Sequence, residues 1–287
     1  MHGADIASSV ERRTTAHFVS GFACTARNTE SPVYTALLPE YAESQRHDNI
    51  VKTRQYLVPI LKRIGAQTVL DAGCGVGVTV RTLLDSGFDC YGFDLLEQVP
   101  QWISSNLPRD RFVVTDPMSL QLPFDDGAFD AVFSIGVLEH VGTVDGHATR
   151  RDDYHEIRRQ WVRELFRVTQ KGGYLLLGGP NRGFPIDAAH GLDAGASRLE
   201  RAISRLTKVS VHRTWGPYFL WSYRDLQHYL DGLPVSVTPL SVDGLLGFSR
   251  VPPPFDMLAR AYVRYLPRAL LGTGFNPWIM ALIKCSP

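Results

Sequence analysis

Short apolar runs alternate with helix-like patterns along most of the chain. The runs predict seven strands, the first at the short run Val69-Leu70 and the others at 89–94, 111–115, 131–135, 174–177, 235–242 and 278–283. Between them, apolar residues at three- and four-residue steps predict helices at 34–64, 78–84, 98–107, 152–168 and 222–230. Such alternation is typical of a doubly wound, Rossmann-like α/β sheet.

The turn after the first predicted strand is rich in glycine. The run Thr68–Gly77 contains D-x-G-x-G-x-G, and the helical pattern starts at Val78. Glycine suits positions of positive φ and positions where backbone approaches a ligand closely. A turn of this kind, at the carboxyl end of a parallel strand, is where α/β sheets bind nucleotide-like ligands.

The glycine spacing differs from the two common phosphate-binding fingerprints. The dinucleotide pattern G-x-G-x-x-G has Val78 in its third glycine position, because the glycine comes one residue early, at Gly77. The phosphate loop lacks its Lys-Ser/Thr pair. Asp71 precedes the glycines, and a carboxylate there favours a cationic amine and disfavours a pyrophosphate.

A second acidic residue, Asp94, ends the second predicted strand, 23 residues after Asp71 (94 − 71). An acidic residue about 20 positions beyond a Gly-rich turn is placed to accept hydrogen bonds from ribose hydroxyls. The two positions together predict a ligand that carries an adenosine.

Two further stretches carry a family resemblance. Residues 122–130 have the pattern L-P-F-x-x-x-x-F-D, and residues 136–141 read Gly-Val-Leu-Glu-His-Val. With the Gly-rich turn, they resemble the class I S-adenosylmethionine (SAM)-dependent methyltransferases of small molecules, over residues 65–181. The stretch Asn-Arg-x-Phe-Pro-Ile-Asp from Asn181 resembles methyltransferases of polysaccharide biosynthesis.

The resemblance implies methyl transfer from SAM to an oxygen, nitrogen or carbon atom of a small-molecule, sugar or lipid-like acceptor. It assigns the methionine end of the cofactor to the turn, the ribose to the end of the second strand and the adenine to the ends of the third and fourth strands. The implied cofactor residues are Asp71, Gly73, Cys74, Gly75, Asp94, Leu95, Asp116, Met118, Ile135 and Gly136.

Two histidines are candidates for proton transfer. His140 follows the fourth predicted strand, and His190 lies in the segment after the fifth, near Asp187. Histidine is the natural proton acceptor near neutral pH. The alternative for His140 is a role in shaping its loop.

The acceptor is expected to meet the N-terminal helices and an insertion after the fifth strand. The candidate substrate residues are Tyr41, Arg54, Asn181, Trp215 and Tyr218, with His47 beside them. Aromatic residues can stack on a planar or sugar-like acceptor. The alternatives are solvated helix faces for the N-terminal residues and fastening of the insertion for the aromatic ones.

These patterns predict the following organisation. Residues 1–30 form a loose tail, and 31–287 form one domain with a core at 65–181, a cap insertion at 182–221 and C-terminal helix and strands at 222–287. A short basic amphipathic helix at 256–271, with Arg260, Arg264 and Arg268, suggests weak contact with a membrane surface. The alternative is an exposed arginine face on a packed helix.

Composition narrows the function classes. The formal net charge is +1 and no basic stripe dominates, which argues against a nucleic-acid partner. The four cysteines form no C-x-x-C pair, so we expect neither a zinc site nor a disulfide framework, and we expect a cytoplasmic protein. No apolar run has the length of a spanning helix, and no metal site is indicated.

Two rival functions share parts of this pattern. An NAD-dependent oxidoreductase would share the fold and Asp94, but the glycine spacing and the Leu-Glu-His-Val run count against it. A non-catalytic SAM-binding regulator would keep the cofactor residues without an acceptor pocket. The acceptor, the methylated atom and the oligomeric state are left open by the sequence.

Overall fold

The computed structural model describes residues 46–95, 98–114, 120–144, 149–187, 192–207, 210–246, 248, 251 and 253–286. The chain divides into two compact units. Unit 1 comprises Met1–Phe133, Glu164–Leu175 and Cys285–Pro287, and unit 2 comprises Ser134–Arg163 and Leu176–Lys284. The predicted boundaries of tail, core and cap stay predictions.

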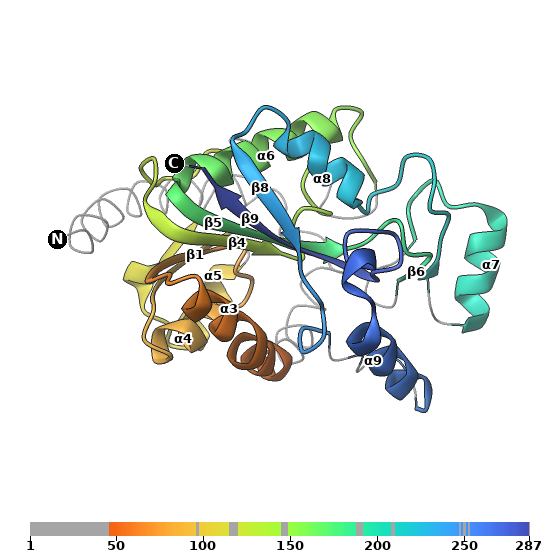
Figure 1. The fold of residues 1–287 in the computed structure, drawn as a ribbon, viewed down its shortest axis with the longest axis horizontal. Coiled ribbons are helices and arrows are strands. Elements are labelled where there is room, and N and C mark those ends of the chain that lie inside the picture. Colours follow the sequence, from red (N-terminus) through yellow and green to blue (C-terminus); the bar gives the residue numbers. More distant parts are fainter. Residues whose placement is uncertain are drawn as a thin grey trace. The chain divides into compact units, whose positions relative to one another are not determined.

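Seven strands are hydrogen-bonded in the order β3-β2-β1-β4-β5-β9-β8 (Figure 1). The order reverses between β1 and β4, which is the doubly wound arrangement that the sequence predicts. The last strand along the chain, β9, lies between β5 and β8. The strands are β1 Thr68–Ala72, β2 Asp89–Asp94, β3 Phe112–Val114, β4 Phe129–Ile135, β5 Thr169–Pro180, β8 Val235–Pro239 and β9 Trp278–Cys285.

In unit 1, β1 pairs in parallel with both β2 and β4. Val69 is opposite Cys90 on one side and Ala131 on the other, and all three are fully buried. Parallel strands covered on both faces carry continuous apolar runs, which explains why they stand out in the sequence. The carboxyl ends of β1 and β2 therefore end at the same edge, with Asp71 opposite Gly92.

The helices of unit 1 precede or connect these strands. The helical pattern before β1 is present from residue 46 within the described range. Val80 and Leu83 of the helix after the Gly-rich turn are fully buried, as its period predicts. The helices are residues 46–52, the π-helix η1 Thr53–Leu57, α3 Val58–Arg63, α4 Val78–Asp85, α5 Val99–Ser104 and the 3₁₀ turn η3 Arg109–Arg111.

Several predicted boundaries are wrong by a few residues. The helix predicted to reach Leu107 ends at Ser104, because Asn106 has a φ of 49° that no helix continues. The strand predicted from Arg111 starts at Phe112, after η3. β8 ends at Pro239, which has no N–H to extend the ladder.

The start of β5 is also earlier than predicted. The preceding helix, α6 (Tyr154–Val168), ends at Val168 as predicted, but the strand predicted from Tyr174 begins directly after it, at Thr169. Gly172 has a φ of 79°, so the glycines serve a local distortion within β5.

Unit 2 contains helices and a small second sheet. α8 (Tyr223–Leu230) begins after its N-cap Ser222, where the Ser222 hydroxyl accepts from the Asp225 N–H and the Asp225 carboxylate accepts from the Ser222 N–H. The antiparallel pair β6–β7 was not predicted, since two-residue strands show no period. The remaining elements are β6 Ile186–Asp187, α7 Arg198–Thr207, β7 Ser210–Val211, α9 Phe255–Tyr265 and η4 Arg268–Leu270.

Within the described ranges, the helices are all too short or too polar to cross a bilayer. The same residues contain no group of three histidine, cysteine or acidic side chains arranged to hold a metal ion.

Candidate cofactor site

The Gly-rich turn of unit 1 is a compact loop between β1 and α4. Gly73, Gly75 and Gly77 all have positive φ, at 95°, 52° and 79°. The N–H groups of Gly73 and Cys74 both donate to the Phe93 carbonyl at 3.0 Å, so the loop is fastened to β2. The three glycines of the D-x-G-x-G-x-G motif are thus explained by the backbone, because residues with a side chain rarely adopt a positive φ.

Close packing, as well as the positive φ, requires glycine at position 77. A Cβ at this position would lie 2.5 Å from Leu107 Cδ1 and 2.7 Å from Phe112 Cε1. Gly77 is also the N-cap of α4, and Val78 begins the helix directly after it. The third glycine therefore serves close packing at the helix start, one residue earlier than in the dinucleotide fingerprint.

Asp94 lies at the end of β2 and contacts the loop directly. Its carboxylate accepts the Gly75 N–H at 2.6 Å through one oxygen and the Leu95 N–H at 2.7 Å through the other. Each carboxylate oxygen has a second lone pair, so the group can accept further hydrogen bonds while it holds the loop. The two predicted motifs, separated in sequence, are thus joined in one site.

Asp71 is the next-to-last residue of β1, close before the same loop, and is 5% exposed. Burial, reinforced by the charge of Asp94, raises the pKa of Asp71 well above its ordinary value of 3.8. Burial, with the same two carboxylates, also raises the pKa of the Cys74 thiol. The loop is therefore an acidic site whose two carboxylates repel each other until a cation or hydrogen-bond donor arrives.

Trp102 of α5 completes the support of the loop, and sequence analysis missed it. Its indole N–H donates to the Gly75 carbonyl at 2.8 Å, and its ring packs against Phe112 at a centroid distance of 4.9 Å. A buried tryptophan usually finds such a partner, but the sequence does not say which one.

In unit 1 the L-P-F segment has a structural role. Arg167 donates to the carbonyls of Leu122 and Phe124, at 3.0 and 2.9 Å, and Glu164 accepts the Leu122 N–H at 2.6 Å. Asp130 accepts the N–H groups of Gln67 and Thr68, both at 2.8 Å. This stretch, which contributed to the resemblance, anchors loops to α6 and to the start of β1.

Unit 2 contains the loop that follows β4. Ile135 and Gly136 are partly exposed, and the Gly136 N–H donates to the Gly178 carbonyl at 2.8 Å. Glu139 is fully buried, whereas His140 is exposed. The turn around His140 is made by its backbone: its N–H donates to the Val137 carbonyl at 2.9 Å.

Arg158 of α6 holds this loop from inside and was also missed. Its side chain is fully buried and donates to the carbonyls of Glu139 at 2.8 Å and Val141 at 2.9 Å. It also donates to the Phe219 carbonyl at 2.7 Å and lies over the Tyr154 ring. One arginine therefore fixes the Leu-Glu-His-Val loop to the segment predicted as a cap.

The Glu139 carboxylate meets Trp221 in the same cluster. The Trp221 indole N–H donates to it at 3.4 Å, and Trp221 is fully buried. A Cβ on Gly179 would lie 2.5 Å from the indole nitrogen and 2.9 Å from a Glu139 oxygen. Close approach thus requires glycine at the end of β5, a position the sequence did not single out.

Comparison with known proteins fits this geometry. A family described as a methyltransferase domain matches residues 70–177. These bounds run from β1, through the Gly-rich turn, Asp94 and the Leu-Glu-His-Val loop, to β5.

Residues 70–177 of this chain are thus similar to a methyltransferase domain.

Two named relatives are similar over this domain. The 2-methyl-6-phytyl-1,4-hydroquinone methyltransferase of Synechocystis sp. is 32% identical over 114 residues, which cover 38% of this chain and 31% of that protein. A chloroplastic protein of Oryza sativa subsp. japonica, named probable tocopherol O-methyltransferase, is 30% identical over 118 residues, covering 39% and 28%. The chain thus spans about a third of each relative's length.

Among solved structures, a SAM-dependent methyltransferase from Aquifex aeolicus is similar with a TM-score of 0.45. The alignment covers 87% of this chain and 96% of that one, at 14% identity.

The predicted cofactor residues of the methyltransferase domain fall into three groups. Asp71, Gly73, Cys74, Gly75, Asp94 and Leu95 are together in unit 1. Ile135 and Gly136 belong to unit 2. Asp116 and Met118 lie outside the described residues.

The predicted acceptor residues are more scattered. Arg54, in η1, and its neighbour His47 are exposed in unit 1. Asn181 is buried, with its amide nitrogen donating to the carbonyls of Thr273 and Asn276, and its amide oxygen accepting the Gly183 N–H. Its side chain thus holds backbone. Tyr41 and His190 lie outside the described residues.

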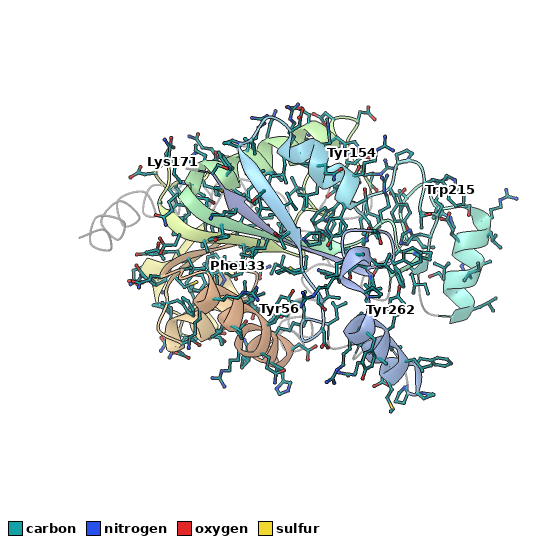
Figure 2. The ribbon with its side chains drawn as sticks, viewed as in Figure 1. Tyr56, Phe133, Tyr154, Lys171, Trp215 and Tyr262 are labelled. Carbon is teal, nitrogen blue, oxygen red and sulfur yellow. The ribbon has the colours of Figure 1, made fainter. Side chains whose placement is uncertain are left out.

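The two aromatic candidates of the insertion differ sharply. Trp215 is 73% exposed (Figure 2), whereas Tyr218 is 1% exposed and stacks on His212 at a centroid distance of 4.7 Å. The Tyr218 hydroxyl accepts the Asp193 N–H, and burial raises its pKa to about 12. These contacts favour fastening of the insertion for Tyr218 and leave Trp215 available for a ligand.

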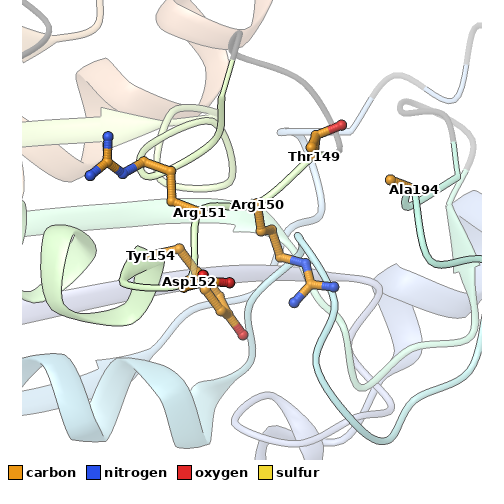
Figure 3. A pocket seen from close by; sticks show the side chains of 6 residues that line it. All are labelled: Thr149, Arg150, Arg151, Asp152, Tyr154 and Ala194. Carbon is orange, nitrogen blue, oxygen red and sulfur yellow. The ribbon is translucent and has the colours of Figure 1, made fainter.

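A pocket of about 280 Å³ opens beside this insertion, lined by Thr149, Arg150, Arg151, Asp152, Tyr154 and Ala194. Its two arginines point in different directions (Figure 3). Arg150 forms an ion pair with buried Asp193 at 3.0 Å, and Arg151 one with Asp153 at 2.9 Å. Because both cations are neutralised by carboxylates, the pocket is a poor site for an anionic group.

Proposed function

We propose that this protein transfers the methyl group of SAM to a nucleophilic atom of a lipid-like small molecule. The observation that carries the proposal is the contact between Asp94 and the Gly75 N–H, which joins the Gly-rich turn and the end of β2 within the methyltransferase domain.

The chemistry of the loop fits this cofactor. Residues 71–78 contain one carboxylate and no arginine or lysine, and Asp94 adds a second carboxylate. Two buried or partly buried carboxylates suit an amine and ribose hydroxyls, and they repel a pyrophosphate. When bound, SAM supplies a methyl group on a cationic sulfonium.

We assign separate roles to the two carboxylates. Asp94 accepts the ribose hydroxyls, from the end of β2 where it also holds the Gly75 and Leu95 N–H groups. Asp71 faces the cationic methionine end, where a positive charge offsets the cost of its burial. The adenine roles of Asp116, Met118, Ile135 and Gly136 are part of the same proposal.

We propose His140 as the proton acceptor when the nucleophile is an oxygen or nitrogen that must lose a proton. His140 is an exposed residue, and its backbone N–H and carbonyl form the turn with Val137 and Thr143. His140→Ala should therefore keep the loop shape that Arg158 also maintains. Loss of turnover with unchanged cofactor affinity is the expected result.

The lipid-like acceptor is supported by the relatives. Two proteins that match this domain are named for a phytyl hydroquinone and for a tocopherol. Both names describe an aromatic head with hydroxyl groups and a long apolar chain. The match covers about a third of each relative, so the acceptor is proposed at the level of this chemical class.

The test is methyl transfer from SAM labelled in its methyl group, with a membrane lipid extract or a water-soluble metabolite extract as acceptor. We expect label in the organic phase from the wild-type protein, and about 100-fold less from His140→Ala if it moves a proton. Label only in the aqueous phase would overturn the acceptor class. Cofactor binding without label in either phase would overturn the proposed catalysis.

A further inference from the structure

Helix α9 (Phe255–Tyr265) carries its large apolar side chains on the outside. Val263 is the one residue of this 11-residue helix that is buried. Five others are between 40% and 76% exposed: Phe255, Met257, Leu258, Tyr262 and Tyr265. A surface helix of a globular protein normally turns such residues inward.

The exposed apolar residues share one side of the helix. At about 100° per residue, they and Ala261 occupy one sector about 160° wide. Arg264 and Arg260 follow at one edge of this sector, and Val263 lies on the opposite side. Helix α9 therefore presents a continuous apolar face with a basic border.

Neighbouring residues extend both the apolar face and the basic border of this helix. The Tyr262 hydroxyl donates to the Phe275 carbonyl at 2.6 Å, and the Phe275 ring is 59% exposed. Figure 2 marks Tyr262 on this helix. Arg268 follows in η4 and is exposed like Arg260 and Arg264. We call Phe255–Tyr265 with Arg268 and Phe275 the α9 surface.

The positive charges of the α9 surface are weakly balanced. Arg260 is 3.8 Å from Asp256, which is the one acidic residue of the helix. Over the described part of the chain, no ion pair is seen for Arg264 or Arg268. An apolar face with excess positive charge is complementary to a surface that is apolar inside and anionic outside.

From this complementarity we infer that the α9 surface docks on the anionic face of a lipid bilayer. The aromatic and aliphatic side chains enter the headgroup boundary, and the three arginines contact anionic headgroups. A second copy of the chain fits this surface less well. Pairing two α9 helices face to face would bring two sets of three arginines together, with one carboxylate in each copy to offset their repulsion. This inference does not depend on the proposed methyl acceptor, because the test measures binding to vesicles and not methyl transfer.

The test is co-sedimentation of the full chain with vesicles. Vesicles of phosphatidylcholine and phosphatidylglycerol in equal parts should bind it, those of phosphatidylcholine alone should bind it weakly, and salt should reduce binding. The triple variant Arg260→Gln/Arg264→Gln/Arg268→Gln should lose about 100-fold in partition coefficient, at about fivefold for each arginine. The variant Met257→Ser/Leu258→Ser/Tyr265→Ser should also lose binding to the mixed vesicles.

Matched control variants distinguish an effect of the α9 surface from an effect of the overall net charge. The variant Arg63→Gln/Arg81→Gln/Arg109→Gln removes the same charge from exposed positions elsewhere and should bind like wild type. Ile103→Ser, at a 53% exposed position, controls for loss of an apolar side chain.

Four outcomes would overturn the inference. Failure of the wild type to bind mixed vesicles would do so, as would equal losses in both charge variants. A concentration-dependent dimer that the serine variant dissociates would assign the α9 surface to a second copy. A large drop in the thermal midpoint of the serine variant would show that the surface is packed within the chain, because exposed side chains contribute little to stability.

Discussion

The Gly-rich loop of unit 1 and the Leu-Glu-His-Val loop of unit 2 are both short turns after parallel strands, yet they are held by different means. The first is made by glycines of positive φ and by a carboxylate 19 positions from Gly75. The second is fixed by a buried arginine from α6 that gathers three carbonyls. Glycine spacing is visible in sequence, whereas a buried arginine looks like any other arginine on a helix.

The largest effect expected from this difference is at Arg158. Arg158→Leu should lower the free energy of unfolding by about 3–5 kcal/mol, because two buried carbonyls and one partly buried carbonyl lose their donor. Arg163→Leu, on the same helix, removes one exposed bond to the Asp231 carbonyl and should cost less than about 1 kcal/mol. Chemical denaturation measures both, and equal losses would refute the role of Arg158.

The next effect concerns the glycines of the first loop. Gly77→Ala should cost about 2–4 kcal/mol of unfolding free energy, from positive φ and from overlap with Leu107 and Phe112. Gly87→Ala is the control, since its φ is 89° but nothing lies within 4 Å of its added Cβ, and it should cost about 1–2 kcal/mol. If Gly87→Ala costs as much, the close packing at Gly77 has no energetic consequence.

The buried carboxylate of the first loop predicts a pH dependence. The folded pKa of Asp71 is raised by burial and by the charge of Asp94, so the folded chain binds this proton more tightly than the unfolded chain does. This contribution to stability is present below the ordinary pKa of 3.8 and is lost as pH rises through the folded value.

Asp71→Asn removes this titration. The variant should therefore gain stability relative to wild type as pH rises, while its affinity for SAM falls by about 10- to 100-fold, the loss expected for a hydrogen bond to a charged group. Urea titrations between acidic and neutral pH, without ligand, compare the two proteins. Parallel stability curves would show that Asp71 is not penalised by burial.

The smallest effect is expected at Trp102. Trp102→Phe keeps the aromatic contact with Phe112 but removes the donor to the Gly75 carbonyl. It should cost about 1 kcal/mol of stability and weaken SAM binding a few-fold. Trp161→Phe, at another buried tryptophan, is the comparison, and it should leave SAM binding unchanged.

The fold and the first half of the site could be predicted because their signals are local. Buried parallel strands appear as apolar runs, and Asp94 follows the turn at the distance that one βαβ unit sets. Arg158, Trp102 and Gly179 could not be predicted, because each acts through residues that are distant in the chain or that become neighbours only in the fold. Asn181 shows the converse: its position after β5 suggested substrate, but its amide holds backbone.

The two loops also distinguish the alternative functions from methyl transfer. An oxidoreductase would need the loop to accept a pyrophosphate, which two carboxylates oppose. A regulator would keep the first loop and have no use for a precisely held second one. The match over residues 70–177 includes both loops, and it favours the methyltransferase.

The most direct test of the central claim is calorimetric titration of the full chain with S-adenosylhomocysteine, with NAD in a parallel titration. We predict binding of S-adenosylhomocysteine alone, reduced about 10- to 100-fold by Asp94→Ala, since one charge-assisted hydrogen bond contributes about 1.5–3 kcal/mol. Asp85→Ala, which removes a carboxylate from an exposed ion pair with Arg81, should bind like wild type. Binding of NAD without S-adenosylhomocysteine, or equal affinities for both aspartate variants, would contradict the account.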